Sequence, residues 1–345
     1  MASRRVNPPS IANSAASPGA RVPTADPAGE FRTHLLELTA DLGGLRFDQA
    51  LARALPQYSR SRLQGWIEAG EVEVDGRQLR AKDKVLGGER VRIHAWLEAD
   101  PQVKPEALPL EVLFKDRALF VINKPAGLVV HPGAGNARHT LQNALLGLDP
   151  KLAVVPRAGI VHRLDKDTSG LLVVARTPES HTALVAALAQ REVSRHYLAV
   201  CTGVMTAGGT VDEPIGRHRS LRTRMAVRAD GKPAVTHYRV LQRFRGHTLV
   251  RAELETGRTH QIRVHLAYIG FPVVGDPLYG GRRRLPAGST PGLVAELNGF
   301  RRQALHAAHL ALEHPTTGRA VEWEAPLPED MTRLLAALEA DGRPS

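Results

Sequence analysis

The residues best suited to chemistry lie close together, in the segment 162–170. It places two aspartates, an arginine, a lysine and a histidine directly before the apolar run 171–175. That run is apolar and β-branched, which predicts a buried strand with the charged cluster at its mouth. Charges at the edge of a core are costly unless they are paired or used. Asp165 and Arg163 are therefore the first candidates for chemistry.

The order of residues in this cluster is similar to a known catalytic motif. His-Arg-Leu-Asp at 162–165, followed by Lys-Asp-Thr-Ser-Gly at 166–170, resembles the pseudouridine synthases that modify large-subunit ribosomal RNA. The resemblance implies that Asp165 is the essential carboxylate. It also implies that Arg163, beside His162, fills the gap left when a target uridine leaves its stack. A solvated turn before a strand is the alternative interpretation.

Two further segments extend the resemblance. Tyr197 lies in the strand-like run 196–201 and matches a family tyrosine that sits over the target uracil, although most strand tyrosines are core residues. Arg263 lies in 255–265, where alternating polar and apolar residues predict a strand. In the family this segment supplies a basic partner for the carboxylate. A guanidinium beside a desolvated aspartate would favour its ionised form and fix its orientation.

The rest of the sequence gives no sign of a cofactor or metal. It contains neither a phosphate-binding glycine loop nor zinc-type cysteine spacing. His260 and His265 are five residues apart without acidic neighbours, so we interpret them as hydrogen-bonding residues rather than metal ligands. The single cysteine, Cys201, excludes an intrachain disulfide framework and fits a reducing compartment, which favours the cytoplasm.

Charge indicates a polyanionic partner. The 345 residues carry a net charge of +11, and no apolar run reaches the roughly 18 residues of a membrane-spanning helix. The span 216–228 holds five arginines and no acid, which favours a loop that follows RNA phosphates. The arginines expected to contact RNA there are Arg217, Arg219, Arg222 and Arg224. Lys124, in a loop that also matches the family, is equally compatible with a structural role and an RNA contact.

A small basic module precedes these segments. From 46 to 94 the sequence predicts two short helices, the second ending at Gly70, then strands with an Asp-Gly turn at 75–76. It resembles the RNA-binding domain named after ribosomal protein S4, which implies that Arg60 and Arg62 face the phosphate backbone. A helical cap with solvated charges is the alternative.

We therefore expect an α+β protein with two domains. The catalytic domain should hold a large mixed, mostly antiparallel sheet split by a cleft, and the S4-like domain should combine helices with short strands. The first segment has the composition of a disordered tail, with a transit peptide as the rival. The expected boundaries are a tail at 1–30, the S4-like domain at 31–98, a linker at 99–109, the catalytic domain at 110–335 and a tail at 336–345.

The expected reaction is isomerisation of uridine to pseudouridine in 23S ribosomal RNA. The sequence segments 58–62, 130–136 and 205–215 resemble those of the family branch that acts on the helix-69 stem-loop. The uridine would be flipped out, its glycosidic bond cleaved, and its uracil rejoined through carbon 5. The rivals are a non-catalytic RNA-binding ribosome-assembly factor and an RNA glycosidase, which would release free base.

Overall fold

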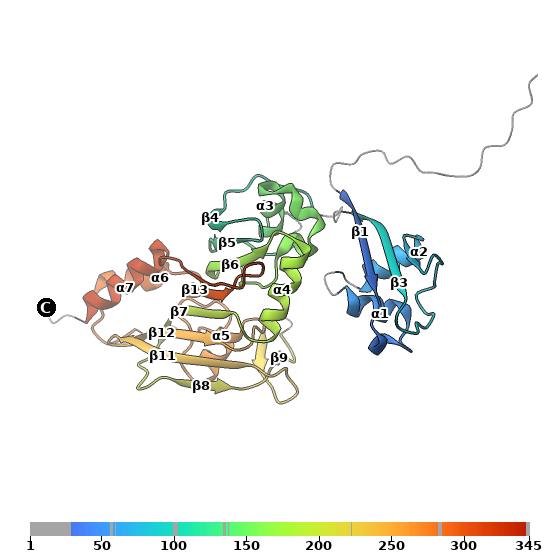
Figure 1. Ribbon diagram of the computed structural model, residues 1–345. Helices are drawn as coiled ribbons and strands as arrows, with labels where there is room; N and C mark the ends of the chain where they lie inside the picture. The colour runs from blue at the N-terminus through green and yellow to red at the C-terminus, as the bar shows by residue number, and fades with distance from the viewer. Residues whose placement is uncertain are drawn as a thin grey trace, which may run out of the picture.

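The N-terminal domain is a three-stranded antiparallel sheet packed against two helices. The computed structural model describes residues 29–55, 58, 60–98, 103–133, 136, 138–221, 223–281 and 285–342. Figure 1 shows this domain, in blue, as a lobe beside the larger domain. Its elements are β1 (Gly29–Glu37), the 3-10 turn η1 (Ala40–Leu42), α1 (Phe47–Ala54), α2 (Arg60–Glu68), β2 (Val72–Val74) and β3 (Arg90–Glu98), with strand order β1-β3-β2.

The local signals in this domain are confirmed. The apolar positions that predicted the helices are buried, among them Phe47, Leu51 and Leu63. Gly70 adopts a positive φ of 75° directly after α2, the conformation that glycine supplies at helix ends. Asp75 and Gly76 both have positive φ, as a two-residue hairpin turn requires. Two of the strands are nine residues long, and so are longer than the sequence suggested.

The larger domain is built on one mixed sheet, as expected. Its strand order is β4-β5-β6-β13-β7-β12-β11-β8, with β14 paired to β13, and only the β6–β13 pairing is parallel. A separate hairpin is formed by β9 and β10. The strands are β4 (Glu111–Lys115), β5 (Leu119–Lys124), β6 (Ser169–Ala175), β7 (Ser194–Thr202), β8 (Gly209–Asp212), β9 (Ile215–Arg217), β10 (Met225–Val227), β11 (Val235–Arg243), β12 (His247–Leu254), β13 (Leu305–Glu313) and β14 (Ala320–Glu324).

Strand β6 lies in the middle of the sheet and is buried on both faces. Alternate residues face opposite ways: Leu172 and Val174 join the main core, whereas Leu171 and Val173 join a second core. Helices α3, α5, α6 and α7 contribute to the main core, and α4 to the second. The helices and 3-10 turns are α3 (Leu141–Leu148), η2 (Pro150–Val154), η3 (Pro156–Gly159), α4 (Pro178–Ala189), α5 (Gln261–Tyr268), α6 (Pro291–Gly299) and α7 (Glu329–Asp341).

Gly170 explains why the charged motif ends in glycine. Its φ is +113°, and a Cβ there would lie 2.2 Å from the carbonyl oxygen of Ala307. The backbones of β6 and β13 pair in parallel at this point. Only glycine allows that approach, so the motif's last residue fixes where β6 begins, and with it the position of the loop that carries Asp165.

Two expectations are wrong. Residues 261–265 form the start of helix α5 rather than a strand. The segment 336–345 is not a tail throughout, because α7 continues to Asp341 and buries Leu338. The predicted N-terminal tail covers residues 1–30. Residues 1–28 lie outside the described residues, and residues 29–30 belong to β1. Arg222, one of the arginines expected to contact RNA, also lies outside the described residues.

The second half of the expected linker is fixed to the catalytic domain. The backbone N–H of Glu106 donates to the carbonyl of Asn143 at 3.0 Å, and the Asn143 amide donates to the carbonyl of Lys104 at 2.7 Å. Val154, in η2, packs against the core of the N-terminal domain. The two domains therefore meet at η2, and the chain is already anchored on α3 from Lys104 onward.

Candidate active site

Asp165 lies in the loop before β6, at the meeting point of two cavities. One cavity has a volume of about 600 Å³ and the other about 580 Å³, and Asp165 and Arg163 line both. The Asp165 side chain is 16% exposed. Its Oδ2 accepts a hydrogen bond of 2.8 Å from Nη1 of Arg263, while the one described group within ion-pair distance of its Oδ1 is His260, at 3.9 Å. One carboxylate oxygen is thus held and the other faces the cavities.

Arg263 is fixed between two carboxylates. Its Nε and Nη2 donate to both oxygens of Asp276, at 2.7 and 2.9 Å, leaving Nη1 for Asp165. Asp276 also accepts the backbone N–H groups of Leu278 and Tyr279, so its orientation is fixed. Burial opposes the charge of Arg263, but the two carboxylates outweigh it and raise the arginine's pKa. The guanidinium therefore stays charged and rigidly aimed at Asp165.

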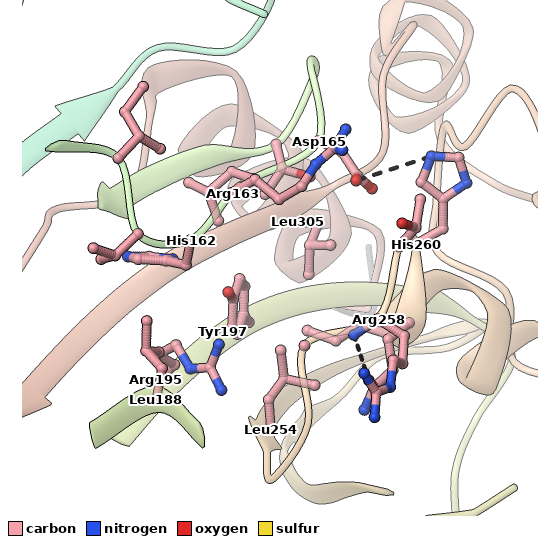
Figure 2. Close-up of a pocket in the computed structure, with 18 of the residues that line it drawn as sticks. His162, Arg163, Asp165, Leu188, Arg195, Tyr197, Leu254, Arg258, His260 and Leu305 are labelled. Carbon is pink, nitrogen blue, oxygen red and sulfur yellow. Dashed lines mark hydrogen bonds and ion pairs between the residues drawn. The ribbon is translucent and has the colours of Figure 1, made fainter. Parts of the chain in front are cut away.

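Tyr197 lines the larger cavity together with Asp165. It lies on β7, is almost fully buried, and points into the cavity (Figure 2). Burial is the largest effect on the Tyr197 hydroxyl and raises its pKa; Asp165 adds to the rise and Arg195 opposes it. The phenol is therefore protonated at neutral pH. That state suits it to stacking and hydrogen-bond donation, and disfavours it as a base.

The two remaining residues of the motif differ in environment. Arg163 is exposed and makes no hydrogen bond or ion pair within the described part of the chain, so its guanidinium is available to RNA. His162 instead accepts a hydrogen bond on Nε2 from the backbone N–H of Val173. Burial lowers the pKa of His162 to about 3. A neutral imidazole bonded to β6 favours a structural role over the RNA contact expected for it.

Lys124 is structural. Its side chain is fully buried, and Nζ donates to the carbonyls of Pro125, Leu128 and Lys166 at 2.8 to 3.0 Å. Burial lowers the pKa of Lys124 to about 7, but three carbonyl acceptors require all three protons of the ammonium form. Lys124 therefore ties the loop after β5 to the loop that carries Asp165, and it is not exposed to RNA.

The other arginines expected to bind RNA lie outside both cavities. Arg60, on α2, is bound to Asp48 but remains half exposed, and Arg62 is partly buried on the same helix. Arg217 and Arg219 are exposed on the β9–β10 hairpin, and Arg224 is partly buried there. These arginines lie on two separate elements, α2 and the β9–β10 hairpin, away from the cavities that Asp165 lines.

The sequence did not single out Arg195 or Asp276. Arg195 lines the larger cavity two residues before Tyr197, on the same strand face, and is only 8% exposed. Its Nε has no hydrogen-bond partner, and no described carboxylate forms an ion pair with it. Alternation along β7 could have placed it beside Tyr197. Nothing local marks Asp276, because its partner lies 13 residues earlier and meets it only in the fold.

His260 and His265 are hydrogen-bonding residues, as the sequence suggested. His265 is buried and contacts the Thr236 hydroxyl and the carbonyl of Glu213, each at 2.9 Å. His260 lines both cavities and contacts the Tyr279 hydroxyl at 2.8 Å. Figure 2 shows the His260 ring facing Asp165 across the cavity.

Comparisons with known proteins agree with this geometry. Residues 118–268 match the family described as RNA pseudouridylate synthase, and residues 45–91 match the S4 domain. The chain is 56% identical over 298 residues to the ribosomal large subunit pseudouridine synthase D of Xanthomonas campestris, covering 86% of this chain and 90% of the relative. The protein of that name from Yersinia pestis is 57% identical over 299 residues, covering 86% and 92%.

A solved structure supports the same relationship. Human RNA pseudouridylate synthase domain containing 4 superposes with a TM-score of 0.53 at 29% sequence identity. The match covers 66% of this chain and 93% of the human chain. The arrangement of Asp165, Arg263 and Tyr197 around one cavity is thus found in a chain whose sequence and fold are similar to those of RNA-modifying enzymes.

Proposed function

This chain belongs to the RNA pseudouridylate synthase family, and we propose that it isomerises uridine to pseudouridine in large-subunit ribosomal RNA. The observation that carries the proposal is a carboxylate, Asp165, whose one oxygen is fixed by Arg263 and whose other oxygen faces a cavity lined by Tyr197. We further propose that the target lies in the helix-69 stem-loop of 23S ribosomal RNA, and that the chain works in the cytoplasm.

The reaction needs three things of the protein. The uridine must leave its stack, its bond from ribose C1′ to N1 must break, and C1′ must bond to C5 while the C5 proton is lost and N1 gains one. Arg163 is exposed at the cavity and has the planar guanidinium that suits the vacated position in the RNA. Tyr197 supplies a face on which the uracil stacks.

Asp165 supplies the charge. Whether its Oδ1 attacks the sugar, attacks the ring or removes a ribose proton, that oxygen must be unprotonated and free, and it makes no hydrogen bond within the described residues. Arg263 orients the carboxylate by binding only the other oxygen. Because the pKa of Tyr197 is raised, the C5 proton is not assigned to a tyrosinate.

RNA outside the cavity would be bound by the exposed arginines. Arg60 and Arg62 on α2, with Arg217, Arg219 and Arg224 on the β9–β10 hairpin, provide cations for phosphates on two elements. Such contacts hold RNA by its backbone and shape, and leave the choice of uridine to the site itself.

Within the described ranges, no helix has the length and apolar character needed to cross a bilayer.

The decisive test replaces Asp165 by Asn in the full chain. Asn keeps the size and removes the charge, so turnover should fall by about 10³-fold or more. The assay is tritium release from 5-tritiated uridine in a 23S fragment containing helix 69. Wild-type turnover at Asp165→Asn would contradict the proposed role of Asp165.

The rival functions give different products. A binding or assembly factor would retain RNA without tritium release, and Asp165→Asn would not matter. An RNA glycosidase would lower the RNA mass by losing uracil, whereas isomerisation leaves the mass unchanged and creates a carbodiimide-reactive nucleoside. Mass analysis with carbodiimide labelling therefore separates all three outcomes.

A further inference from the structure

A second set of contacts leads toward Asp165 from the side of the carboxylate that Arg263 does not bind. The backbone N–H of Met225, in β10, donates to the hydroxyl of Tyr279 at 2.8 Å. The same hydroxyl lies 2.8 Å from Nδ1 of His260, whose Nε2 lies 3.9 Å from Oδ1 of Asp165. These contacts end at the carboxylate oxygen that Arg263 does not bind.

The direction of the hydrogen bonds follows from the donors available. The Tyr279 oxygen already accepts the Met225 N–H, and its single proton needs an acceptor. Nδ1 of His260 is the described acceptor within reach, and accepting that proton requires Nδ1 to carry none. A neutral imidazole then carries its proton on Nε2, the nitrogen that faces Asp165. The opposite assignment would leave the tyrosine proton without any described acceptor.

We propose that Tyr279 is a positioning residue that holds His260 neutral and protonated on Nε2, so that a neutral N–H faces the free oxygen of Asp165. The inference rests on the proposed function in one respect, since that function makes Asp165 the reacting carboxylate. The Arg263–Asp165 hydrogen bond does not require it, since His260, which contacts the Tyr279 hydroxyl, lies nearest the other oxygen of the carboxylate.

The charges around His260 are consistent with a neutral ring. Burial is the largest effect and lowers its pKa; Asp165 and Asp276 oppose this, whereas Arg263 and Arg163 add to it. The hydrogen bond between His260 and Tyr279 also favours a neutral ring. Protonating Nδ1 would place two N–H donors on the Tyr279 oxygen and displace the phenol's own hydrogen bond. An imidazolium at His260 therefore costs a hydrogen bond as well as desolvation.

Neutrality matters because of what a second cation would do to Asp165. Arg263 already supplies one positive charge at Oδ2. An imidazolium beside Oδ1 would stabilise the carboxylate further and make that oxygen a weaker base and nucleophile. A neutral N–H can orient Oδ1, or a substrate oxygen near it, without that penalty. Tyr279 would thus protect the reactivity of Asp165 as pH falls.

The first experiment removes the Tyr279 hydroxyl with Tyr279→Phe. The ring, which lies 5.1 Å from the Arg263 guanidinium, is kept. Histidine ¹⁵N NMR of the full chain, with the His260 signal identified by its loss in His260→Gln, reports the tautomer without any RNA. We expect the Nε2–H form in the wild type and, in Tyr279→Phe, a mixed tautomer with a His260 pKa closer to its ordinary value. A wild-type ring protonated on Nδ1 would overturn the proposal.

The second experiment measures single-turnover tritium release against pH. In Tyr279→Phe the rate should fall by roughly tenfold near pH 6 and approach the wild-type rate near pH 8.5, because His260 now gains its proton at higher pH. A loss of merely structural support would lower the rate by the same factor at every pH, and that result would overturn the proposal. The matched control is Tyr268→Phe, which removes an exposed hydroxyl from α5, the helix that directly follows His260, and should leave the profile unchanged.

Substitutions of His260 complete the test. Gln can place a neutral N–H near the Nε2 position, whereas Asn places its amide near Nδ1. We expect His260→Gln to be about tenfold more active than His260→Asn, and Tyr279→Phe to have no pH-dependent effect in the His260→Gln background. Equal activities for Gln and Asn would overturn the proposal.

Failure of the proposed function would be recognised separately. If the wild type released no tritium from the 23S fragment, or if Asp165→Asn kept full turnover, the reaction or the role of Asp165 would be wrong. The NMR measurement would still test the His260 tautomer, because it requires neither RNA nor turnover.

Discussion

Two aspartates in this molecule are bound by arginine, and their surroundings give them opposite roles. Asp48, in the N-terminal domain, has no exposed side-chain surface. Its Oδ2 accepts hydrogen bonds from Arg60 and Gln64 at 2.6 Å each, and its Oδ1 accepts one from Arg46 at 3.1 Å. Within the described residues the Asp165 side chain accepts one hydrogen bond, on Oδ2, and Asp165 lines two cavities.

We infer from the comparison that the unsatisfied oxygen, and not the ion pair, is what would make Asp165 the reactive carboxylate. The described donors around Asp48 connect α1 to α2, and its side chain has no exposed surface for a substrate to reach. Arg263 is anchored on Asp276 and offers Asp165 a single N–H. A charged group that is buried and left half satisfied is costly to stability, which is the expected cost of a functional site.

The largest expected effect sharpens this contrast at Asp165. Asp165→Asn should lower turnover by about 10³-fold or more, while leaving the thermal midpoint of the full chain within about 2 °C of wild type. The carboxylate makes one hydrogen bond, and Asp276 still neutralises Arg263. Calorimetry measures the thermal midpoint, and the tritium assay measures turnover. A large drop in thermal midpoint would mean that Asp165 is structural, like Asp48.

Asp48→Asn should do the reverse. It removes the acceptor of two arginines and should destabilise the N-terminal domain by about 1–3 kcal/mol, a modest value because both guanidiniums remain half solvated. Hydrogen exchange of peptides from 29–98 measures the loss. Single-turnover rates at saturating RNA should stay near wild type. A fall in that rate without faster exchange would break the comparison.

The pH dependence of the same domain follows from Asp48. Burial opposes its ionisation, but hydrogen bonds from Arg60, Gln64 and Arg46 outweigh burial and lower the pKa of Asp48. A depressed folded-state pKa contributes stability that is present above the unfolded pKa of about 4 and is lost as pH falls through the folded value. Asp48→Asn should therefore weaken the acid sensitivity of hydrogen exchange in this domain.

The sequence predicted the elements whose patterns are local. Strand β6 is an unbroken apolar run, and the Asp75-Gly76 turn follows from two residues. Helix α5 was read as a strand because it has no polar face to reveal its period: residues 261–266 are all buried. Its polar members are satisfied by partners distant in sequence, such as Thr236 for His265. Alternation over five residues fits either structure when burial surrounds the segment.

The site was predictable only in part for a similar reason. Motif order gave Asp165, Tyr197 and Arg263, which now line one cavity. Asp276 and Tyr279 reach the site through contacts between elements that no local pattern encodes. Lys124 could be assigned to structure only after its three carbonyl acceptors were seen.

Arg195 offers a smaller test of the same rule. If an unsatisfied buried charge marks function, Arg195→Met should lower single-turnover activity by about tenfold without lowering the thermal midpoint, because no described carboxylate loses its partner. The matched control is Arg176→Met, which breaks a buried pair with Asp149 and should lower the midpoint. A midpoint for Arg195→Met as low as that control would assign Arg195 to structure.

The smallest effect is expected at the exposed arginines. Arg219 is exposed on the β9–β10 hairpin, so Arg219→Gln should cost less than about 1 kcal/mol in RNA binding. If Arg219 neutralises a phosphate, the slope of log affinity against log salt should become shallower by about 0.7–0.9, with the single-turnover rate at saturating RNA unchanged. Arg319→Gln, an equal charge change on an exposed residue beside β14, is the control. The same slope change in both variants would reflect net charge alone, and the hairpin would then have no specific part in holding RNA.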